Sequence, residues 1–241
     1  MTEEDDTAVD PPTLVLLPGL DGTGLLFRPL MAEFAGRTRA RVISYPPDQS
    51  LPLENLAALV LRQLPPDKPV LVAESFSGLV ALAALMTAAA RVAGMIFVGA
   101  FAEPPRPFLL RLAPLISPSS LVRAAPAFLL RRFCLGPDAT AHDLKLLREA
   151  LATVSPNVLA QRLSVIGTRH AFGKARIEVP CSYIRPKRDR LVPASSVEWF
   201  RSHFKRCEVE TIDAPHFVLQ RKPKEAGQMI IRIARLLSAA A

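Results

Sequence analysis

Short apolar runs alternate with longer amphipathic stretches along most of this chain. Six of the runs are brief, rich in Val, Ile or Leu, and bounded by turn residues, which is typical of strands buried on both faces of a sheet. They cover residues 14–17, 41–45, 70–73, 95–98, 181–184 and 208–212. Between them, apolar residues recur at helical spacing over residues 24–35, 53–64, 76–90, 194–204 and 217–238. This alternation predicts an α/β fold with a mostly parallel sheet.

Residues 103–178 interrupt this rhythm because they contain no good strand candidate. They are rich in proline and predict several short helices, with Thr140 and Ser155 as N-caps. These helices have broad apolar faces, formed by Phe108, Leu109, Leu112, Leu115, Ile116, Phe128, Leu129 and Phe133. We therefore expect a helical subdomain or lid at 103–178, inserted into a core made of residues 13–102 and 179–241. Residues 1–12 are polar and predict a frayed, acidic arm.

The composition is that of a folded chain. Half of the 241 residues are hydrophobic and 22% are charged, which excludes a disordered protein and is enough for a sizeable core. No apolar run reaches the roughly 18 residues that a membrane-spanning helix needs. The acidic start lacks the apolar segment of a secretory signal, so a cytoplasmic location is the default expectation.

The net charge of +8 is unevenly distributed. Five of the 22 acidic residues lie within residues 1–12, so the remaining chain carries 30 basic residues against 17 acidic ones. Such a body would attract anionic partners: nucleic acid, lipid headgroups or an acidic carrier protein. However, the bases are scattered, aromatic residues make up only 6%, and no nucleic-acid motif is visible. These features favour an ordinary solvated surface and no nucleic-acid partner.

Metal and disulfide chemistry find little support in the sequence. Cys134, Cys181 and Cys207 are odd in number and far apart, which excludes a disulfide scaffold and a CxxC zinc site. The four histidines are dispersed without ligand-like spacing. We expect neither a metal nor an organic cofactor.

One segment has the pattern of a nucleophile elbow. Residues 70–81 read VLVAESFSGLVA, which predicts a strand, a sharp turn at Ser75 and then a helix. The neighbours two positions away, Ala73 and Ser77, are small, as required where a serine is held in a strained backbone conformation with its hydroxyl projecting from the sheet. By itself, this pattern also fits an ordinary strand-to-helix turn with Ser75 as the N-cap.

Two further residues complete a candidate for nucleophilic catalysis. Asp189 follows one predicted strand, and a carboxylate there can orient an imidazole and stabilise its charged form. His216 follows the next strand and opens the last helix, and histidine is the side chain whose ordinary pKa suits proton transfer near neutrality. The other histidines fit less well, since His142 and His170 lie in the insertion and His203 within a predicted helix. The alternatives are a surface or capping acid and a capping or partly buried histidine.

A glycine-rich loop follows the first strand. Residues 16–24 read LLPGLDGTG, and such a loop can place a backbone N–H beside the serine. We assign one oxyanion-hole N–H to Leu20 and the other to Phe76, the residue after the serine. The rival interpretation is a phosphate-binding loop, but the run lacks the Lys-Ser/Thr of a P-loop and the GxGxxG order of a dinucleotide site.

Together these segments resemble the α/β-hydrolase superfamily, in its serine esterase and lipase-like branch. The resemblance rests on PGLDGTG (18–24), AESFSG (73–78), DRLVP (189–193) and DAPHF (213–217). The chain order serine, aspartate, histidine is that of α/β-hydrolases and differs from the orders in chymotrypsin-like and subtilisin-like enzymes. The resemblance implies an eight-stranded, mostly parallel sheet, a helical lid, a Ser75–His216–Asp189 triad and an oxyanion hole at Leu20 and Phe76.

The sequence departs from that family's pattern in four places. Pro18 stands where lipases often have histidine, Glu74 precedes the serine, and Pro186 replaces a usual glycine. The first clear strand begins near residue 13, which leaves no room for two leading strands and favours a compact sheet of about six. Glu74 is either a second group near the triad or a side chain in a polar pocket below the turn, and burial would require a partner.

These residues predict a serine hydrolase that cleaves carboxylic esters through an acyl-enzyme on Ser75. The apolar residues of the insertion suggest a small or medium-sized apolar acyl or alcohol group. The alternative is an acyl thioesterase or acyltransferase acting on an acyl-carrier or CoA substrate, suggested by the basic body and by bases at residues 131–132 and 185–190. A third hypothesis is a non-catalytic binding protein that uses the lid pocket as a receptor site.

Overall fold

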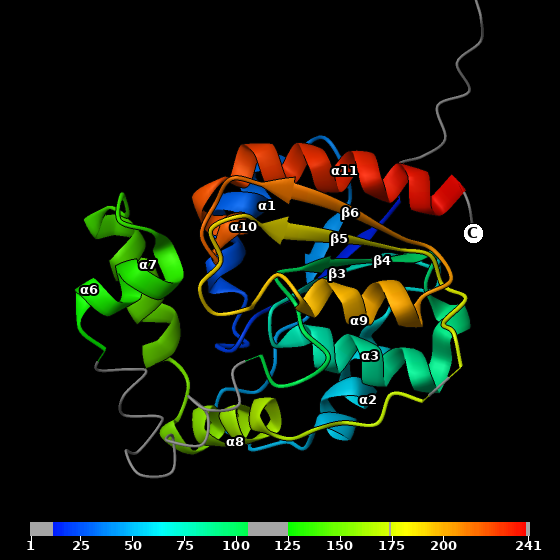
Figure 1. The fold of residues 1–241 in the computed structure, drawn as a ribbon, viewed down its shortest axis with the longest axis horizontal. Coiled ribbons are helices and arrows are strands. Elements are labelled where there is room, and N and C mark those ends of the chain that lie inside the picture. The colour runs from blue at the N-terminus through cyan, green and yellow to red at the C-terminus, as the bar shows by residue number, and fades with distance from the viewer. Residues whose placement is uncertain (1–11, 106–124, 174, 240–241) are drawn as a thin grey trace, which may run out of the picture.

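The computed structural model describes residues 12–105, 125–173 and 175–239 (Figure 1). The predicted arm at residues 1–12 falls almost entirely outside the described residues. The same holds for the predicted apolar positions from Phe108 to Ile116.

A parallel sheet forms the centre of the molecule, with its six strands in the order β2-β1-β3-β4-β5-β6. The strands are β1 (Leu14–Leu17), β2 (Ala40–Val42), β3 (Val70–Glu74), β4 (Gly94–Val98), β5 (Cys181–Pro186) and β6 (Cys207–Ile212). Five of them coincide with apolar runs of the sequence to within two residues at each end, whereas β2 shares only residues 41 and 42 with its predicted run, 41–45. The compact, six-stranded α/β architecture is therefore confirmed.

Helices cover both faces of the sheet (Figure 1). One face carries α2 (Leu53–Gln63), α3 (Ser77–Ala88) and α9 (Ser196–His203); the other carries α1 (Arg28–Phe34) and α11 (Pro223–Ala239). Successive strand residues point to opposite faces. Accordingly, Val15 and Leu17 belong to the core under α2, α3 and α9, whereas Leu14 and Leu16 belong to the core under α1 and α11. Burial on both faces explains why the inner strands β1, β3 and β4 are almost entirely apolar, whereas the edge strands β2 and β6 also carry charged residues.

The described part of the segment between β4 and β5 is mostly helical. It contains α6 (Ala127–Leu130), η4 (Arg131–Leu135), α7 (Ala141–Ala152) and α8 (Pro156–Gly167). Thr140 and Asp143 form a reciprocal capping box at α7, and the Ser155 hydroxyl caps α8, as the sequence predicts. A third apolar core lies within this segment. Figure 1 shows α6 and α7 beyond the carboxyl ends of the strands.

Several expected elements differ in detail from the structure. Residues 24–35 form a short 3-10 helix, Leu25–Phe27, followed by α1. The long helix expected at 217–238 breaks at Lys222, so that α10 (Val218–Arg221) precedes α11, because Pro223 supplies no backbone N–H to continue the first helix. Phe128 does not pack inward as expected but is 66% exposed. Within the described ranges, no helix is both long and apolar enough to cross a membrane.

Candidate active site

Ser75 occupies a strained turn between β3 and α3. Its φ angle is 50°, in the left-handed region that side chains other than glycine rarely adopt. The small neighbours Ala73 and Ser77 are fully buried, consistent with the tight turn predicted from the sequence. Gly78 is also required there, because a Cβ at this position would lie 2.8 Å from the Cβ of Ala100. The turn therefore projects Ser75 at the carboxyl end of the sheet, where ligands bind in open α/β folds.

The structure brings Ser75, His216 and Asp189 into one hydrogen-bonded chain. The Nε2 of His216 lies 3.0 Å from the Ser75 Oγ, and its Nδ1 lies 2.7 Å from the Asp189 Oδ2. The other Asp189 oxygen accepts the backbone N–H groups of Leu191 and Val192. These bonds fix the carboxylate, which in turn orients the imidazole so that Nε2 faces the hydroxyl. The geometry is that of a nucleophile, a base and an orienting acid.

The charge of Asp189 controls the basicity of His216. Burial by itself would lower the pKa of His216, but the charge of Asp189 and its hydrogen bond outweigh that effect and raise the pKa above its ordinary value. Gly99, at the end of β4, lets the backbone pass beneath the pair. Its φ is 52°, and a Cβ there would lie 3.4 Å from the His216 Nδ1. The sequence analysis did not single out this glycine.

The loop after β1 lies beside Ser75. A Cβ placed on Gly19 would lie 3.9 Å from the Ser75 Cβ, so this loop and the turn at Ser75 are neighbours. Neither the Leu20 N–H nor the Phe76 N–H has a hydrogen-bond acceptor among the residues that the structure describes. Free backbone donors beside a nucleophile are what stabilisation of an oxyanion requires.

The comparisons with known proteins identify the family of the chain. Residues 14–226 match the model of a family described as the alpha/beta hydrolase family. The chain belongs to the alpha/beta hydrolase family. It is therefore a hydrolase by family and fold. No curated protein is similar enough in sequence to count as a match.

Solved structures of other hydrolases share the fold at low sequence identity. A hydrolase from Oleispira antarctica is 14% identical with a TM-score of 0.78, over 93% of this chain and 91% of the other. An esterase from Thermogutta terrifontis is 19% identical with a TM-score of 0.75, over 95% and 91%. YbtT, a type II thioesterase from the yersiniabactin biosynthetic pathway, is 18% identical with a TM-score of 0.71, over 95% of each chain.

A hydroxyl relay fixes the start of the hydrolase's loop 18–24. The Ser77 hydroxyl donates to the Pro18 carbonyl, and the Tyr45 hydroxyl lies 2.5 Å from the Ser77 oxygen. Since Ser77 has a single proton, Tyr45 donates to Ser77. Burial raises the pKa of Tyr45, so this phenol keeps its proton. Ser77 therefore has two roles: its small side chain permits the tight turn at Ser75, and its hydroxyl holds the loop through the hydrogen bond to Pro18.

Arg162, a residue that sequence reasoning missed, holds the same loop from the inserted segment. It lies on α8 and is 2% exposed. Its guanidinium donates to the carbonyl oxygens of Leu20 (3.0 Å), Asp21 (2.6 Å) and Pro46 (3.0 Å), and it lies over the Tyr45 ring. The close approach requires glycine at residue 22, where a Cβ would lie 2.5 Å from the Arg162 Nη1.

The buried Glu74 side chain has a hydrogen-bond partner, Gln220. Its carboxylate accepts hydrogen bonds from the Gln220 side chain, at 3.0 Å, and from the Gly19 N–H. Burial nevertheless raises the pKa of Glu74 to about 7, although the Gln220 hydrogen bond opposes the shift. Glu74 is therefore a polar group below the turn at Ser75, and its charge state is coupled to that of His216. Gln220 was not identified from the sequence.

The described residues do not contain a cluster of three or more His, Cys, Asp or Glu side chains that could hold a metal ion. Cys181 and Cys207, although far apart in sequence, are direct register partners on β5 and β6. Both thiols are free.

Proposed function

We propose that this hydrolase cleaves carboxylic esters with small or medium-sized apolar acyl or alcohol groups, through an acyl-enzyme on Ser75. The observation that carries the proposal is the hydrogen-bonded chain from Ser75 through His216 to Asp189. A buried serine–imidazole–carboxylate chain beside free backbone N–H groups matches the requirements of acyl transfer.

The first half-reaction transfers the acyl group to the enzyme. His216 removes the proton of the Ser75 hydroxyl as its oxygen attacks the acyl carbon, and the N–H groups of Leu20 and Phe76 stabilise the oxyanion. The C–O bond to the alcohol then breaks, and His216 returns its proton to the departing oxygen. Asp189 remains ionised and stabilises the imidazolium that forms between these steps.

Water completes the cycle. It attacks the acyl-serine while His216 takes its proton, the same oxyanion donors act again, and the carboxylic acid leaves as the Ser75 hydroxyl is restored. The apolar residues Phe128, Pro137 and Pro215, which line the pocket beside Asp189, support a preference for apolar substrate groups.

Replacement of Ser75 by alanine tests the proposal. The Ser75→Ala variant should lose p-nitrophenyl acetate and butyrate hydrolysis by a factor of about 10³ or more, because nucleophilic attack is removed. The matched control is Ser202→Ala, an exposed serine of α9. A fluorophosphonate probe should label the wild type and the control but not Ser75→Ala. Retained hydrolysis in folded Ser75→Ala would refute Ser75 as the nucleophile. Failure of the probe to label the folded wild type would favour a non-catalytic binding protein.

An acyl thioesterase or acyltransferase is the second candidate. The chemistry at Ser75 would be the same, and the leaving atom would be sulfur. The basic residues beside the site favour this alternative, and one of the structural neighbours is a thioesterase. Turnover of an acyl thioester and its matched oxygen ester separates the two candidates.

A further inference from the structure

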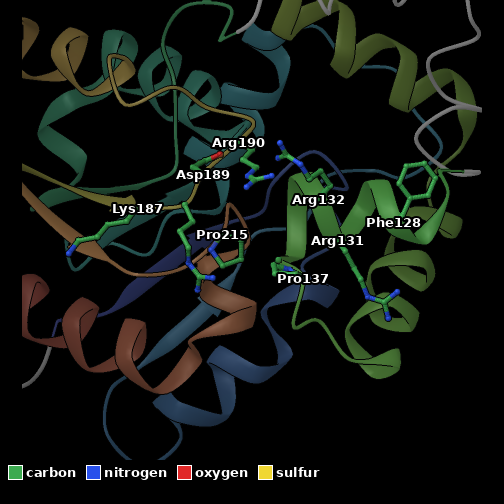
Figure 2. A pocket seen from close by; sticks show the side chains of 10 residues that line it. Phe128, Arg131, Arg132, Pro137, Lys187, Asp189, Arg190 and Pro215 are labelled. Carbon is green, nitrogen blue, oxygen red and sulfur yellow. The ribbon is translucent and has the colours of Figure 1, made fainter.

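A basic pocket lies beside the candidate triad (Figure 2). Its volume is about 690 Å³, within the usual range of small-molecule sites. Two segments supply its basic lining. One is the loop after β5 that carries Asp189, called the acid loop below, and the other is formed by the first helices after residue 125. The basic residues are Arg131, Arg132, Lys187, Arg188 and Arg190. Among the described residues, Asp189 is the one acidic side chain that lines it.

The positive charge of this pocket is only partly neutralised. Asp189 is already committed to His216 and to two backbone N–H groups. Arg188 pairs with Asp213 at 2.9 Å, and Arg131 donates to the carbonyl of Ala139. The remaining bases, Arg132, Lys187 and Arg190, have no carboxylate within ion-pair distance among the described residues.

Two of the unpaired guanidinium groups face each other. Figure 2 shows Arg190, from the acid loop, and Arg132, from η4, directed toward one another across the pocket. Like charges in this arrangement repel each other, and an anion between them would turn the repulsion into attraction. Guanidinium groups bind phosphate through paired N–H donors, so two of them from opposite walls form a clamp suited to a phosphate group.

The pocket adjoins the acid end of the candidate triad. Asp189, whose side chain bonds His216, is one of its lining residues, and Pro215, which precedes His216 in the sequence, is another. A ligand in the pocket would therefore lie beside two residues that border His216, the proposed proton donor to the leaving group. The leaving half of the substrate is thus the half that the pocket would receive.

We propose that this pocket binds a phosphate carried by the leaving group of the substrate, such as the phosphorylated thiol of an acyl-CoA. The proposal rests on acyl transfer through Ser75, which both candidate functions share, and it names the leaving group expected for the thioesterase candidate. Ser75 Oγ forms a bond to the acyl carbon, the carbon–sulfur bond breaks, and the thiol leaves with the proton held by His216. Water then releases the acid and restores Ser75, so no other reactant is needed.

Matched thioesters test the phosphate preference. Butyryl-CoA and S-butyryl-N-acetylcysteamine contain the same reacting bond, but only the first carries phosphate. We expect kcat/KM to be at least about 10-fold higher for butyryl-CoA, with the ratio falling as salt screens the charges. In the Arg132→Gln/Arg190→Gln variant the ratio should fall toward one. The exposed Arg235→Gln of α11 is the matched control and should keep the wild-type ratio.

A second pair of substrates identifies the source of the phosphate. Dihexanoyl phosphatidylglycerol is compared with dihexanoylglycerol, which lacks the phosphate. A preference confined to this pair assigns the pocket to a lipid headgroup, and a preference confined to the thioesters assigns it to a soluble thiol. Equal kcat/KM values within both pairs, or a preference that survives in the double variant, overturn the proposal.

Binding without turnover separates this proposal from the proposed function. CoA and pantetheine, which lacks phosphate, are titrated by calorimetry into Ser75→Ala. CoA should bind at least about 10-fold more tightly, and the difference should disappear when Arg132→Gln and Arg190→Gln are added. If hydrolysis depends on Ser75 but CoA and pantetheine bind equally, the phosphate site is wrong and the hydrolase remains. If CoA binds tightly but Ser75→Ala keeps full activity, the proposed function is wrong instead.

Discussion

At the level of single residues, the buried carboxylate of Glu74 has the most unusual environment in the site. Its neighbours Gln220 and Gly19 supply hydrogen bonds but no positive charge, so burial dominates and the pKa rises to about 7. Glu74 is directly before Ser75 in sequence, and its charge raises the pKa of His216. One residue thus influences both the stability of the protein and the protonation of His216, the proposed catalytic base.

The first prediction concerns stability and pH. Glu74 has a folded pKa of about 7 against an ordinary value of 4.5. The folded state therefore binds the proton more tightly, and stability is lost as pH rises from about 4.5 through 7. Glu74→Gln lacks this loss, so the variant should gain stability relative to the wild type by about 2–3 kcal/mol between pH 5 and pH 8. Urea unfolding at both pH values measures this, with exposed Glu54→Gln as the control. An equal difference at both pH values would contradict the assignment.

The second prediction concerns the pH dependence of activity. His216 must be neutral to accept the serine proton, and its pKa is raised. The acid limb of kcat/KM should therefore have its midpoint above 6.5, the ordinary value for histidine. Glu74→Gln removes a nearby negative charge and should move that midpoint to lower pH. A midpoint that does not move in Glu74→Gln would show that the two groups are uncoupled during turnover.

At the level of secondary-structure elements, α8 shows how the helical pattern can reveal a buried charged residue. Its buried face is formed by Val158, Leu159, Arg162, Val165 and Ile166, at helical spacing. Arg162 is the charged residue on an otherwise apolar face, and this is the signal in the sequence that could have identified it. The pattern cannot name its partners, because the carbonyl groups that it binds belong to loops more than 100 residues earlier.

The third prediction tests whether Arg162 positions the oxyanion loop. Arg162→Met should lower kcat by about 10²-fold with little change in KM, because misplaced oxyanion donors affect the transition state more than substrate binding. The kcat of Arg162→Lys should lie between those of the wild type and Arg162→Met, since an ammonium group cannot span three carbonyl groups. Added guanidinium ion should restore part of the activity of Arg162→Ala. The control is the exposed Arg148→Met of α7. A fall in stability with unchanged kcat would reduce Arg162 to a structural role.

At the level of the whole molecule, two arginines join the inserted helices to the core in opposite directions. Arg162 reaches from α8 into the core loop, whereas Arg221 reaches from α10 to Asp143 at the start of α7 and to Asp138. Asp143 thus serves both the capping box of α7 and the contact with the core. The position of the inserted helices over the strand ends depends on a few polar contacts in addition to their apolar core.

The fourth prediction follows from this second contact. Arg221→Met leaves the mostly buried Asp143 without its cationic partner and should lower the free energy of unfolding by about 3 kcal/mol. Amide hydrogen exchange should increase at the start of α7, while α2, on the core, keeps its wild-type protection. Equal increases in both helices would indicate general destabilisation rather than release of α7.

The fold was largely predictable from the sequence, because short apolar runs alternate with longer stretches of helical spacing, which is typical of a parallel sheet covered by helices on both faces. The meeting of Ser75, Asp189 and His216 was predictable because each follows a strand and parallel strands end at the same edge. The unpredicted features are long-range polar contacts. Neither the pairing of Glu74 with Gln220 nor the register of Cys181 with Cys207 leaves a local pattern, because each depends on how distant segments pack.

The contact between Arg162 and the loop after β1 limits how far this enzyme can be reduced in size or recombined with its relatives. A shortened protein that lacks the inserted helices would keep its sheet and its three reacting side chains, yet its loop carbonyl groups would lose their common donor. Exchange of the insertion for one from another hydrolase, with the aim of a new substrate range, should therefore retain a guanidinium at this place. The inserted segment thus contributes to two places at once, because η4 lines the basic pocket while α8 holds the loop after β1.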